Sequence, residues 1–375
     1  MTSTRRRAYI DWARGIAVLL MIEAHTVDAW TRLNVRRTVA FRDATVLGGF
    51  AAPLFLWLAG LALVLAATRT AERTGRRRDA VDTICRRGLE IFILGFLFRL
   101  QGFIITPGGH PVSLFRVDIL NIMGPAIFAA GLVWGLGRTT TGRVLAFAAI
   151  VAATTMVTPI VRISSTVGAL PLWLQWYLRP SGTFNEFTIF TMFPWAGFVF
   201  AGGAVGVLVA AARDGREERR LHAILGAIGV ALVVIGFYTA GRPSIYVSSS
   251  FWTSSPTWFA IRLGIMMIAL TVVFVSEAAF AALSTRTMTP SIVPGVDPLA
   301  RLGRSSLFIY WIHVELVYGY ASWLWRHRLP LWGTAIGFVL FSILMYRAIG
   351  WRDLLVAKWQ GRSRSGHPAG RAVPA

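Results

Sequence analysis

The sequence predicts an all-α fold: a polytopic membrane bundle of about ten transmembrane helices with both termini in the cytoplasm. Hydrophobic residues make up 55% of the 375 residues and charged residues only 15%, with a mean hydropathy of +0.60. This composition is too apolar for a soluble domain. The stretches 45–68 and 187–212 contain no charged residue, and each exceeds the roughly 20 residues that a helix needs to cross a bilayer.

Apolar stretches of this kind follow one another along most of the chain. They predict transmembrane helices at 9–30, 45–68, 88–106, 117–136, 144–161, 187–212, 221–241, 257–282, 303–325 and 329–350. The third, fourth and ninth of these carry internal charges. The Trp-containing stretch 170–178 is too short to cross, and we expect it at the membrane interface.

The distribution of basic residues predicts the orientation. With the N-terminus inside, 25 of the 38 Lys and Arg residues fall in inner segments or at inner span ends, and 10 fall in outer segments. Such an excess marks the cytoplasmic side. We therefore expect a basic cytoplasmic N-terminus at 1–8, a transmembrane domain at 9–350 and a basic, disordered cytoplasmic tail at 351–375. The expected location is the inner membrane of a bacterial-type cell.

Several other classes are disfavoured. The net charge of +21 suits nucleic acid, but the arginines lie between spans and no soluble domain is left to bind it, so no nucleic-acid partner is expected. The first apolar stretch contains Asp11 and Arg14 and lacks a small-residue cleavage site, unlike a signal peptide. The single Cys85 can form no intramolecular disulfide.

The first span carries ionisable residues where a simple anchor would carry none. Arg14 and His25 are eleven positions apart, which places them within about 20° on one helix face and roughly 16 Å apart along the axis. Ionisable side chains in a membrane helix are costly and tend to mark function. We predict His25 as a catalytic base with Asp28 as its carboxylate partner, because Asp28 at i+3 adjoins it. Glu23 points about 200° away.

Other polar residues gather in the predicted outer half of the bundle. They suggest a polar chamber open to the outer face, in which substrate would be bound. The alternative is that these residues form charge pairs that hold helices together. The predicted substrate-binding set is Arg116, Asp118, Asn121, Arg262 and His313.

Seven phrases resemble one family in order along the chain. They are IDWARGIAVLLMIEAH (10–25), APLFLWLAG (52–60), RRGLEIFILGFL (86–97), FRVDILNIMG (115–124), FPWAGFVFAGGAVG (193–206), TSSPTWFAIRLG (253–264) and LGRSSLFIYWIH (302–313). The chain thereby resembles the catalytic domain of heparan-α-glucosaminide N-acetyltransferase in its bacterial homologues, within a wider group of multi-spanning membrane acyltransferases.

The resemblance implies acyl transfer from acetyl-CoA, or another acyl-CoA, to a sugar or glycan acceptor. It assigns the central histidine to His25, adds Asp11 and Arg14 from a D-x-x-R-G motif, and matches an arginine at the start of span four to Arg116. Many bacterial relatives place an Asp directly before the histidine, where this chain has Ala24. The histidine could deprotonate the acceptor or carry the acyl group itself.

The donor suggests a cationic site on the inner side. Arg14 and the cluster Arg76, Arg77 and Arg78 are predicted to bind the phosphates of acyl-CoA, since arginine suits phosphate. The basic loop 69–87, which contains this cluster, could instead only set topology or touch anionic lipid. No metal site is predicted, because no HExxH-type spacing occurs. A transporter or flippase of a polar or glycolipid substrate is the main alternative function, and a homodimer is compatible with the sequence.

Overall fold

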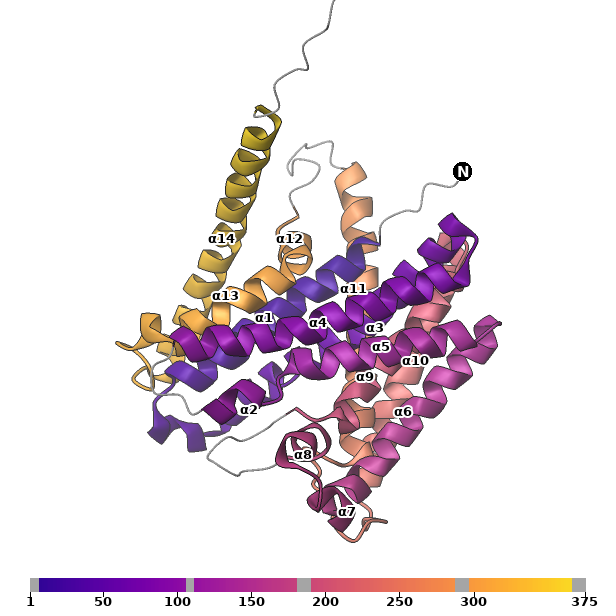
Figure 1. Ribbon diagram of the computed structural model, residues 1–375, viewed down its shortest axis with the longest axis horizontal. Coiled ribbons are helices and arrows are strands. Elements are labelled where there is room, and N and C mark those ends of the chain that lie inside the picture. Colours follow the sequence, from indigo (N-terminus) through magenta and orange to yellow (C-terminus); the bar gives the residue numbers. More distant parts are fainter. Residues whose placement is uncertain (1–6, 106–110, 181–189, 287–296, 366–375) are drawn as a thin grey trace, which may run out of the picture.

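The computed structural model describes residues 7–105, 111–180, 190–286 and 297–365, and these are helical almost throughout (Figure 1). No β-strand occurs within these ranges. The longer helices are α1 (Ala8–Trp30), α3 (Ala51–Thr74), α4 (Arg77–Ile105), α5 (Ile119–Leu136), α6 (Thr140–Ile163), α9 (Met192–Ala211), α10 (Gly215–Ala240), α11 (Pro256–Arg286) and α14 (Leu331–Ser365). The shorter ones are α2 (Val39–Gly48), α7 (Ser165–Gly168), α8 (Leu172–Leu178), α12 (Pro298–Arg304) and α13 (Ser306–Tyr318).

The all-α polytopic prediction is confirmed. Within the described ranges, eight helical segments are long and apolar enough to cross a membrane. The other two predicted spans correspond to α1, which carries several charged residues, and to α12 with α13, which are short.

Three predicted segments differ in part from the structure. The predicted span 45–68 lies within the apolar segment Val39–Thr74, but the helix is broken there, because α2 ends at Gly48 and α3 begins at Ala51. The span at 303–325 is interrupted at Ser305 and ends at Tyr318, where Gly319 stops the helix. The segment predicted as a disordered tail from 351 is helical through Ser365, since α14 continues past the predicted end. Residues 366–375 lie outside the described ranges.

Capping residues set the ends of the helices at the short turns. Gly75 adopts a φ of 69°, a left-handed conformation that glycine tolerates best, and its N–H reaches the Ala71 carbonyl to end α3. Asp214 accepts from the backbone N–H groups of Arg216 and Glu217 at the start of α10. These bonds favour the ionised carboxylate and lower the pKa of Asp214. Because the turn at Gly75 is short, α4 begins at Arg77 and packs against α3.

Glycine allows α3 and α9 to lie in backbone contact. A Cβ at Gly202 of α9 would collide with the Trp57 carbonyl of α3, and a Cβ at Gly60 would collide with the Val199 carbonyl. Small residues at such crossings let membrane helices approach closely. The pair α3 and α9 therefore forms the centre of the larger hydrophobic core, with the fully buried Trp57 and Phe198.

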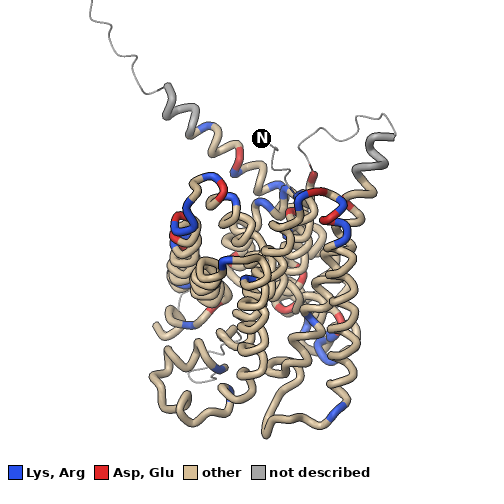
Figure 2. Tube along the Cα trace, turned by 90° about the vertical axis from the view of Figure 1, so that its right-hand side faces the viewer, with Lys and Arg blue, Asp and Glu red and all other residues tan. Residues whose placement is uncertain are grey.

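Helix α1 lies in the middle of the molecule and packs against α2, α3, α12, α13 and α14. Figure 2 shows Lys and Arg concentrated at the end of the bundle where α1 begins, and α14 leads back toward that same end. This arrangement agrees with the sidedness predicted from the sequence. It places the His25 end of α1 at the end of the bundle predicted to face outward.

Candidate functional site

A large cavity extends along α1 between α3, α4, α5 and α13. Its volume is about 1100 Å³, somewhat larger than the roughly 300–1,000 Å³ of most small-molecule sites. Arg14 lines one end of it and Asp28 the other. Since both residues belong to α1, the helical rise separates the two ends by about 20 Å. The cavity thus covers much of the roughly 30 Å hydrocarbon thickness of a bilayer.

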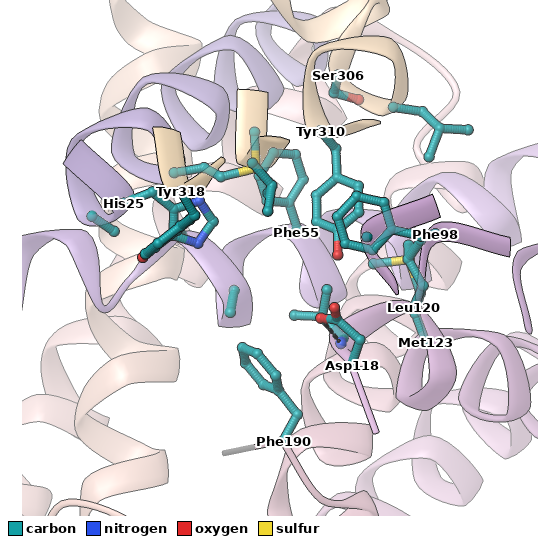
Figure 3. Close-up of a pocket in the computed structure, with 18 of the residues that line it drawn as sticks. His25, Phe55, Phe98, Asp118, Leu120, Met123, Phe190, Ser306, Tyr310 and Tyr318 are labelled. Carbon is teal, nitrogen blue, oxygen red and sulfur yellow. Dashed lines mark hydrogen bonds between the residues drawn. The ribbon is translucent and has the colours of Figure 1, made fainter. Parts of the chain in front are cut away.

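His25 lines the outer part of this cavity and contacts His313. His25 Nδ1 lies 2.7 Å from His313 Nε2. The ring planes are 11° from parallel and the centroids are 4.9 Å apart. Rings stacked face to face stay about 3.5 Å apart or more, so a separation of 2.7 Å means that the rings meet edge to edge in a hydrogen bond. Figure 3 shows His25 and Tyr318 together on one side of the cavity.

His313 lies behind His25 rather than in the cavity. Its side chain is 0% exposed, and it is not among the residues that line the cavity. Its Nδ1 lies 2.8 Å from the Ile309 carbonyl and 3.0 Å from the Tyr310 carbonyl. Both ring nitrogens therefore face protein atoms. The structure does not place His313 on the cavity, so the predicted direct contact with substrate finds no support in this geometry.

Asp28 is close to His25 but is not its hydrogen-bond partner. Its carboxylate accepts from the Tyr318 hydroxyl at 2.9 Å and lies 3.3 Å from the Arg36 guanidinium. Arg36 also donates to the Asp28 backbone carbonyl. The Asp28 carboxylate therefore bonds to Arg36 and Tyr318, because hydrogen bonds to a charged group are strong. In the structure, the hydrogen-bond partner of His25 is His313, in place of the predicted Asp28.

The opposite wall contains an ion pair between α4 and the start of α5. Arg99 Nη2 lies 2.9 Å from Asp118 Oδ2, and both residues line the cavity. Arg116 also lines it. The Tyr310 hydroxyl interacts with the Asp118 carboxylate, and Figure 3 shows both residues across the cavity from His25. The structure thus brings two of the predicted substrate-binding residues, Arg116 and Asp118, to one wall.

Asn121 and Arg262, predicted to bind substrate, do not line the cavity in the structure. Asn121 Oδ1 accepts from the Asp118 backbone N–H in a capping box, so it holds the first turn of α5. Arg262 donates to the Gly49 carbonyl and lies over the rings of Phe50 and Trp258. Neither residue lines the cavity. Arg262 instead hydrogen-bonds to the Gly49 carbonyl at the break between α2 and α3.

The inner end of the cavity is cationic. Arg14, Arg87 and Arg304 line it and come from three different helices, α1, α4 and α12. Asp11, predicted to be catalytic, is buried, lies 3.8 Å from Arg14 and does not line the cavity. Fourteen positions on α1 separate it from His25, which is about 21 Å. Asp11 and His25 are therefore too far apart to contact one another.

The D-x-x-R-G motif serves the packing of α12 against α1. A Cβ at Gly15 would collide with the Leu299 carbonyl, and a Cβ at Gly303 would collide with the Asp11 carbonyl. This close approach brings the end of α12 beside Arg14. The motif therefore shapes the inner end of the cavity.

The cluster Arg76, Arg77 and Arg78 lies apart from the cavity. Arg77 donates to the Gly135 carbonyl at the end of α5, and Arg78 lies 3.9 Å from Asp82 with its side chain 91% exposed. Arg77 lines a second, smaller hollow with Arg143 and Glu72. The structure does not join this predicted phosphate-binding set to the cavity that holds His25.

Three cavity residues were missed by sequence reasoning: Arg304, Tyr318 and Arg326. Arg87 closes the basic loop predicted at 69–87, and its position on the cavity has a signal in the sequence. Ile91, Phe98 and Gly102 follow it at spacings of 4, 11 and 15 residues, which lie within about 60° on one helix face. No group of three His, Cys, Asp or Glu residues that could hold a metal occurs in the part of the chain that the structure describes.

The comparisons with known proteins agree with the resemblance found in the sequence. The family described as heparan-alpha-glucosaminide N-acetyltransferase, catalytic, matches residues 6–248, well over half of the chain. The matched region contains His25, Arg87, Arg99, Arg116 and Asp118 but ends before α12 and α13, which supply Arg304 and His313. No curated protein matches the chain. From the family match and the helical membrane fold, the chain belongs to the heparan-alpha-glucosaminide N-acetyltransferase catalytic family and is a multi-pass membrane acyltransferase.

Proposed function

We propose that this protein transfers an acetyl or other acyl group from cytoplasmic acyl-CoA to a sugar or glycan acceptor on the outer side of the membrane, at His25. One observation carries the proposal: a single cavity joins three arginines at its inner end to His25 near its outer end. Such a cavity allows a charged donor to stay on one side while its acyl end reaches a base near the other side.

The inner end suits the donor. Acyl-CoA is anionic at its nucleotide end and carries its thioester at the tip of a long, flexible arm. Arg14, Arg87 and Arg304 would bind the phosphates, because guanidinium groups match phosphate oxygens in charge and geometry. With about 16 Å between Arg14 and His25 along α1, the arm would lie within the cavity and its thioester beside the imidazole.

The outer end suits a sugar. Arg116, Asp118, Glu315, Tyr318 and Arg326 line the cavity on that side and offer donors and acceptors for hydroxyl groups. The ion pair of Arg99 with Asp118, at 2.9 Å, fixes the orientation of that carboxylate. These groups would orient an acceptor hydroxyl or amine toward His25.

The chemistry needs one proton acceptor at the junction of the two substrates. His25 would remove the proton from the acceptor hydroxyl or amine while its oxygen or nitrogen attacks the thioester carbon. The carbon–sulfur bond breaks, and His25 returns the proton to the departing thiolate, giving the acylated acceptor and free CoA. In a two-step route, a His25 nitrogen attacks the thioester carbon first, the carbon–sulfur bond breaks and CoA leaves as the thiolate. The acceptor then attacks the acyl carbon, the bond to His25 breaks, and the acceptor's proton ends on the CoA thiolate.

Purified protein tests this proposal through thiol release from acetyl-CoA, followed with and without a panel of sugar acceptors. We expect release that depends on an acceptor and falls by about 10²–10⁴-fold in His25→Ala, the usual effect of removing a general base. His327→Asn is the matched control, because His327 is outside the cavity lining and its φ of 55° suits asparagine. Uptake of a sugar or glycolipid by vesicles without any thiol release would instead establish the transporter alternative.

A further inference from the structure

We propose that His313 is a positioning residue that fixes His25 as the tautomer with its proton on Nδ1, so that Nε2 is the nitrogen presented to the substrates. The tautomer follows from hydrogen bonds alone, and its catalytic consequence rests on the proposed function. His313 lies beyond the region that the family match covers.

The His313 side chain is hydrogen-bonded to the backbone of its own helix, α13. His313 Nδ1 lies 2.8 Å from the Ile309 carbonyl and 3.0 Å from the Tyr310 carbonyl, one turn back along the helix. A carbonyl oxygen only accepts, so Nδ1 of His313 must carry the proton. A neutral imidazole has one N–H. Nε2 of His313 is therefore an acceptor.

The acceptor role of His313 Nε2 determines which nitrogen of His25 carries the proton. His313 Nε2 lies 2.7 Å from His25 Nδ1 in an edge-to-edge contact. Because Nε2 accepts, His25 Nδ1 must donate and must carry the proton. The lone pair of neutral His25 is then on Nε2, the nitrogen that can accept a proton or form a bond to the acyl carbon.

If His313 Nε2 instead donated to His25 Nδ1, both nitrogens of His313 would have to carry protons. That ring is 0% exposed, and its ring nitrogens contact two carbonyls and a neutral imidazole rather than a carboxylate. Burying a charge without a charged partner is costly. The neutral arrangement is the one that the surroundings stabilise.

His313 thus performs the task that a carboxylate performs in many histidine-dependent sites, where a partner on one nitrogen selects the tautomer. Here the partner is neutral and is itself oriented by two backbone carbonyls. The anchor is rigid because it depends on main-chain atoms of a helix. It also explains why Asp28 can pair with Arg36 and Tyr318 instead.

The inference is tested by replacing the acceptor and then restoring it. His313→Leu removes the acceptor, whereas His313→Gln places an amide oxygen near the Nε2 position. We expect His313→Leu to lower kcat by about 10²-fold or more, as for loss of an oriented base, with KM for acyl-CoA unchanged. His313→Gln should recover activity to within about tenfold of wild type on the same scale. Equal losses in folded Leu and Gln variants would overturn the acceptor role.

His222 supplies the matched control. It is also a buried histidine, stacked on Phe274 away from the cavity. His222→Leu and His222→Gln should have the same kcat as each other, since neither changes a hydrogen bond to His25. A larger loss for Leu than for Gln at this position as well would show that the pattern at His313 reflects general packing, and would overturn the inference.

The tautomer itself can be read without turnover. In protein labelled with ¹⁵N-histidine, the ring signals of His25 are assigned by their loss in His25→Asn. We expect the proton on Nδ1 in the wild type and a shift toward Nε2–H in His313→Leu. An Nε2–H tautomer in the wild type would overturn the inference whether or not the protein transfers acyl groups. An inactive wild type with Nδ1–H would refute only the proposed function.

Discussion

His25 and His313 are 288 positions apart in the sequence and lie within hydrogen-bond distance in the fold. The sequence singles out His25 as a candidate functional residue, because an ionisable side chain in an apolar helix is costly. It could not identify the partner, because that choice depends on how α13 packs against α1.

Helix geometry correctly placed Asp28 next to His25, but Arg36 and Tyr318 compete for its carboxylate. In the same way, the Asn121 amide oxygen bonds to the Asp118 backbone N–H and the Arg262 guanidinium bonds to the Gly49 carbonyl.

Replacing Asp28 tests whether it pairs only with Arg36 and Tyr318 or also acts directly on His25. Its carboxylate pairs with Arg36 and is 56% exposed, and an exposed ion pair contributes about 0–1 kcal/mol. We expect Asp28→Asn to lower acyl transfer by no more than about fivefold on that basis. The measurement is kcat/KM beside that of His25→Ala. A loss as large as that of His25→Ala would show that Asp28 acts directly on the histidine.

The inner arginines allow a comparison of two candidate donor sites. If Arg87 and Arg304 bind the CoA phosphates, Arg87→Gln and Arg304→Gln should each raise KM for acyl-CoA by about 10–100-fold, because a hydrogen bond to a charged group contributes about 1.5–3 kcal/mol. The triple Gln variant of Arg76, Arg77 and Arg78 is the comparison. A larger increase in the triple variant than in either single variant would place the donor in the loop that the sequence suggested.

At the scale of helices, the spans were predictable because hydrophobicity sums over about 20 residues and tolerates local exceptions. Their ends were less predictable. The break between α2 and α3 depends on Arg262, more than 200 positions away, donating to the Gly49 carbonyl. The break at Ser305 lies between α12 and α13, where Gly303 allows α12 to approach α1. Such features depend on contacts between helices rather than on the composition of one helix.

The close crossing of α3 and α9 leads to a stability prediction. A glycine in a helix is usually less stabilising than alanine, but a Cβ at Gly202 would collide with the Trp57 carbonyl. We expect Gly202→Ala to destabilise the protein by about 1–3 kcal/mol, as overpacking does. The measurement is the thermal midpoint in detergent. Gly226→Ala on α10 is the control, because a Cβ there meets only ordinary contacts and the midpoint should not fall.

At the scale of the whole molecule, the charge pattern predicted a sidedness that the arrangement of the helices agrees with. The starting end of α1 is the end at which Lys and Arg concentrate. The cavity gives this orientation a functional meaning, since its arginine-rich end lies toward the same side. The cavity itself could not be predicted in detail, because its wall combines residues of helices that are far apart in the sequence.

Cysteine labelling tests the sidedness directly. In a Cys85→Ser background, Gly75→Cys lies in the turn between α3 and α4, and Ser248→Cys lies in the exposed segment between α10 and α11. An impermeant maleimide added outside intact cells should label position 248 and spare position 75, because inner segments carry the excess of basic residues. Labelling of position 75 from outside would invert the topology.

Transfer of an acyl group through one cavity, from a donor on one side of the membrane to an acceptor on the other, can be measured across a closed membrane. Proteoliposomes with the α3–α4 turn facing inward, loaded with acetyl-CoA carrying a labelled acetyl group, test it most directly when the sugar acceptor is supplied only outside. We expect labelled acceptor outside and free CoA inside, with transfer reduced by about 10²-fold or more in His25→Ala. Labelled product that forms only when donor and acceptor are on the same side, or transfer that persists in His25→Ala, would contradict it.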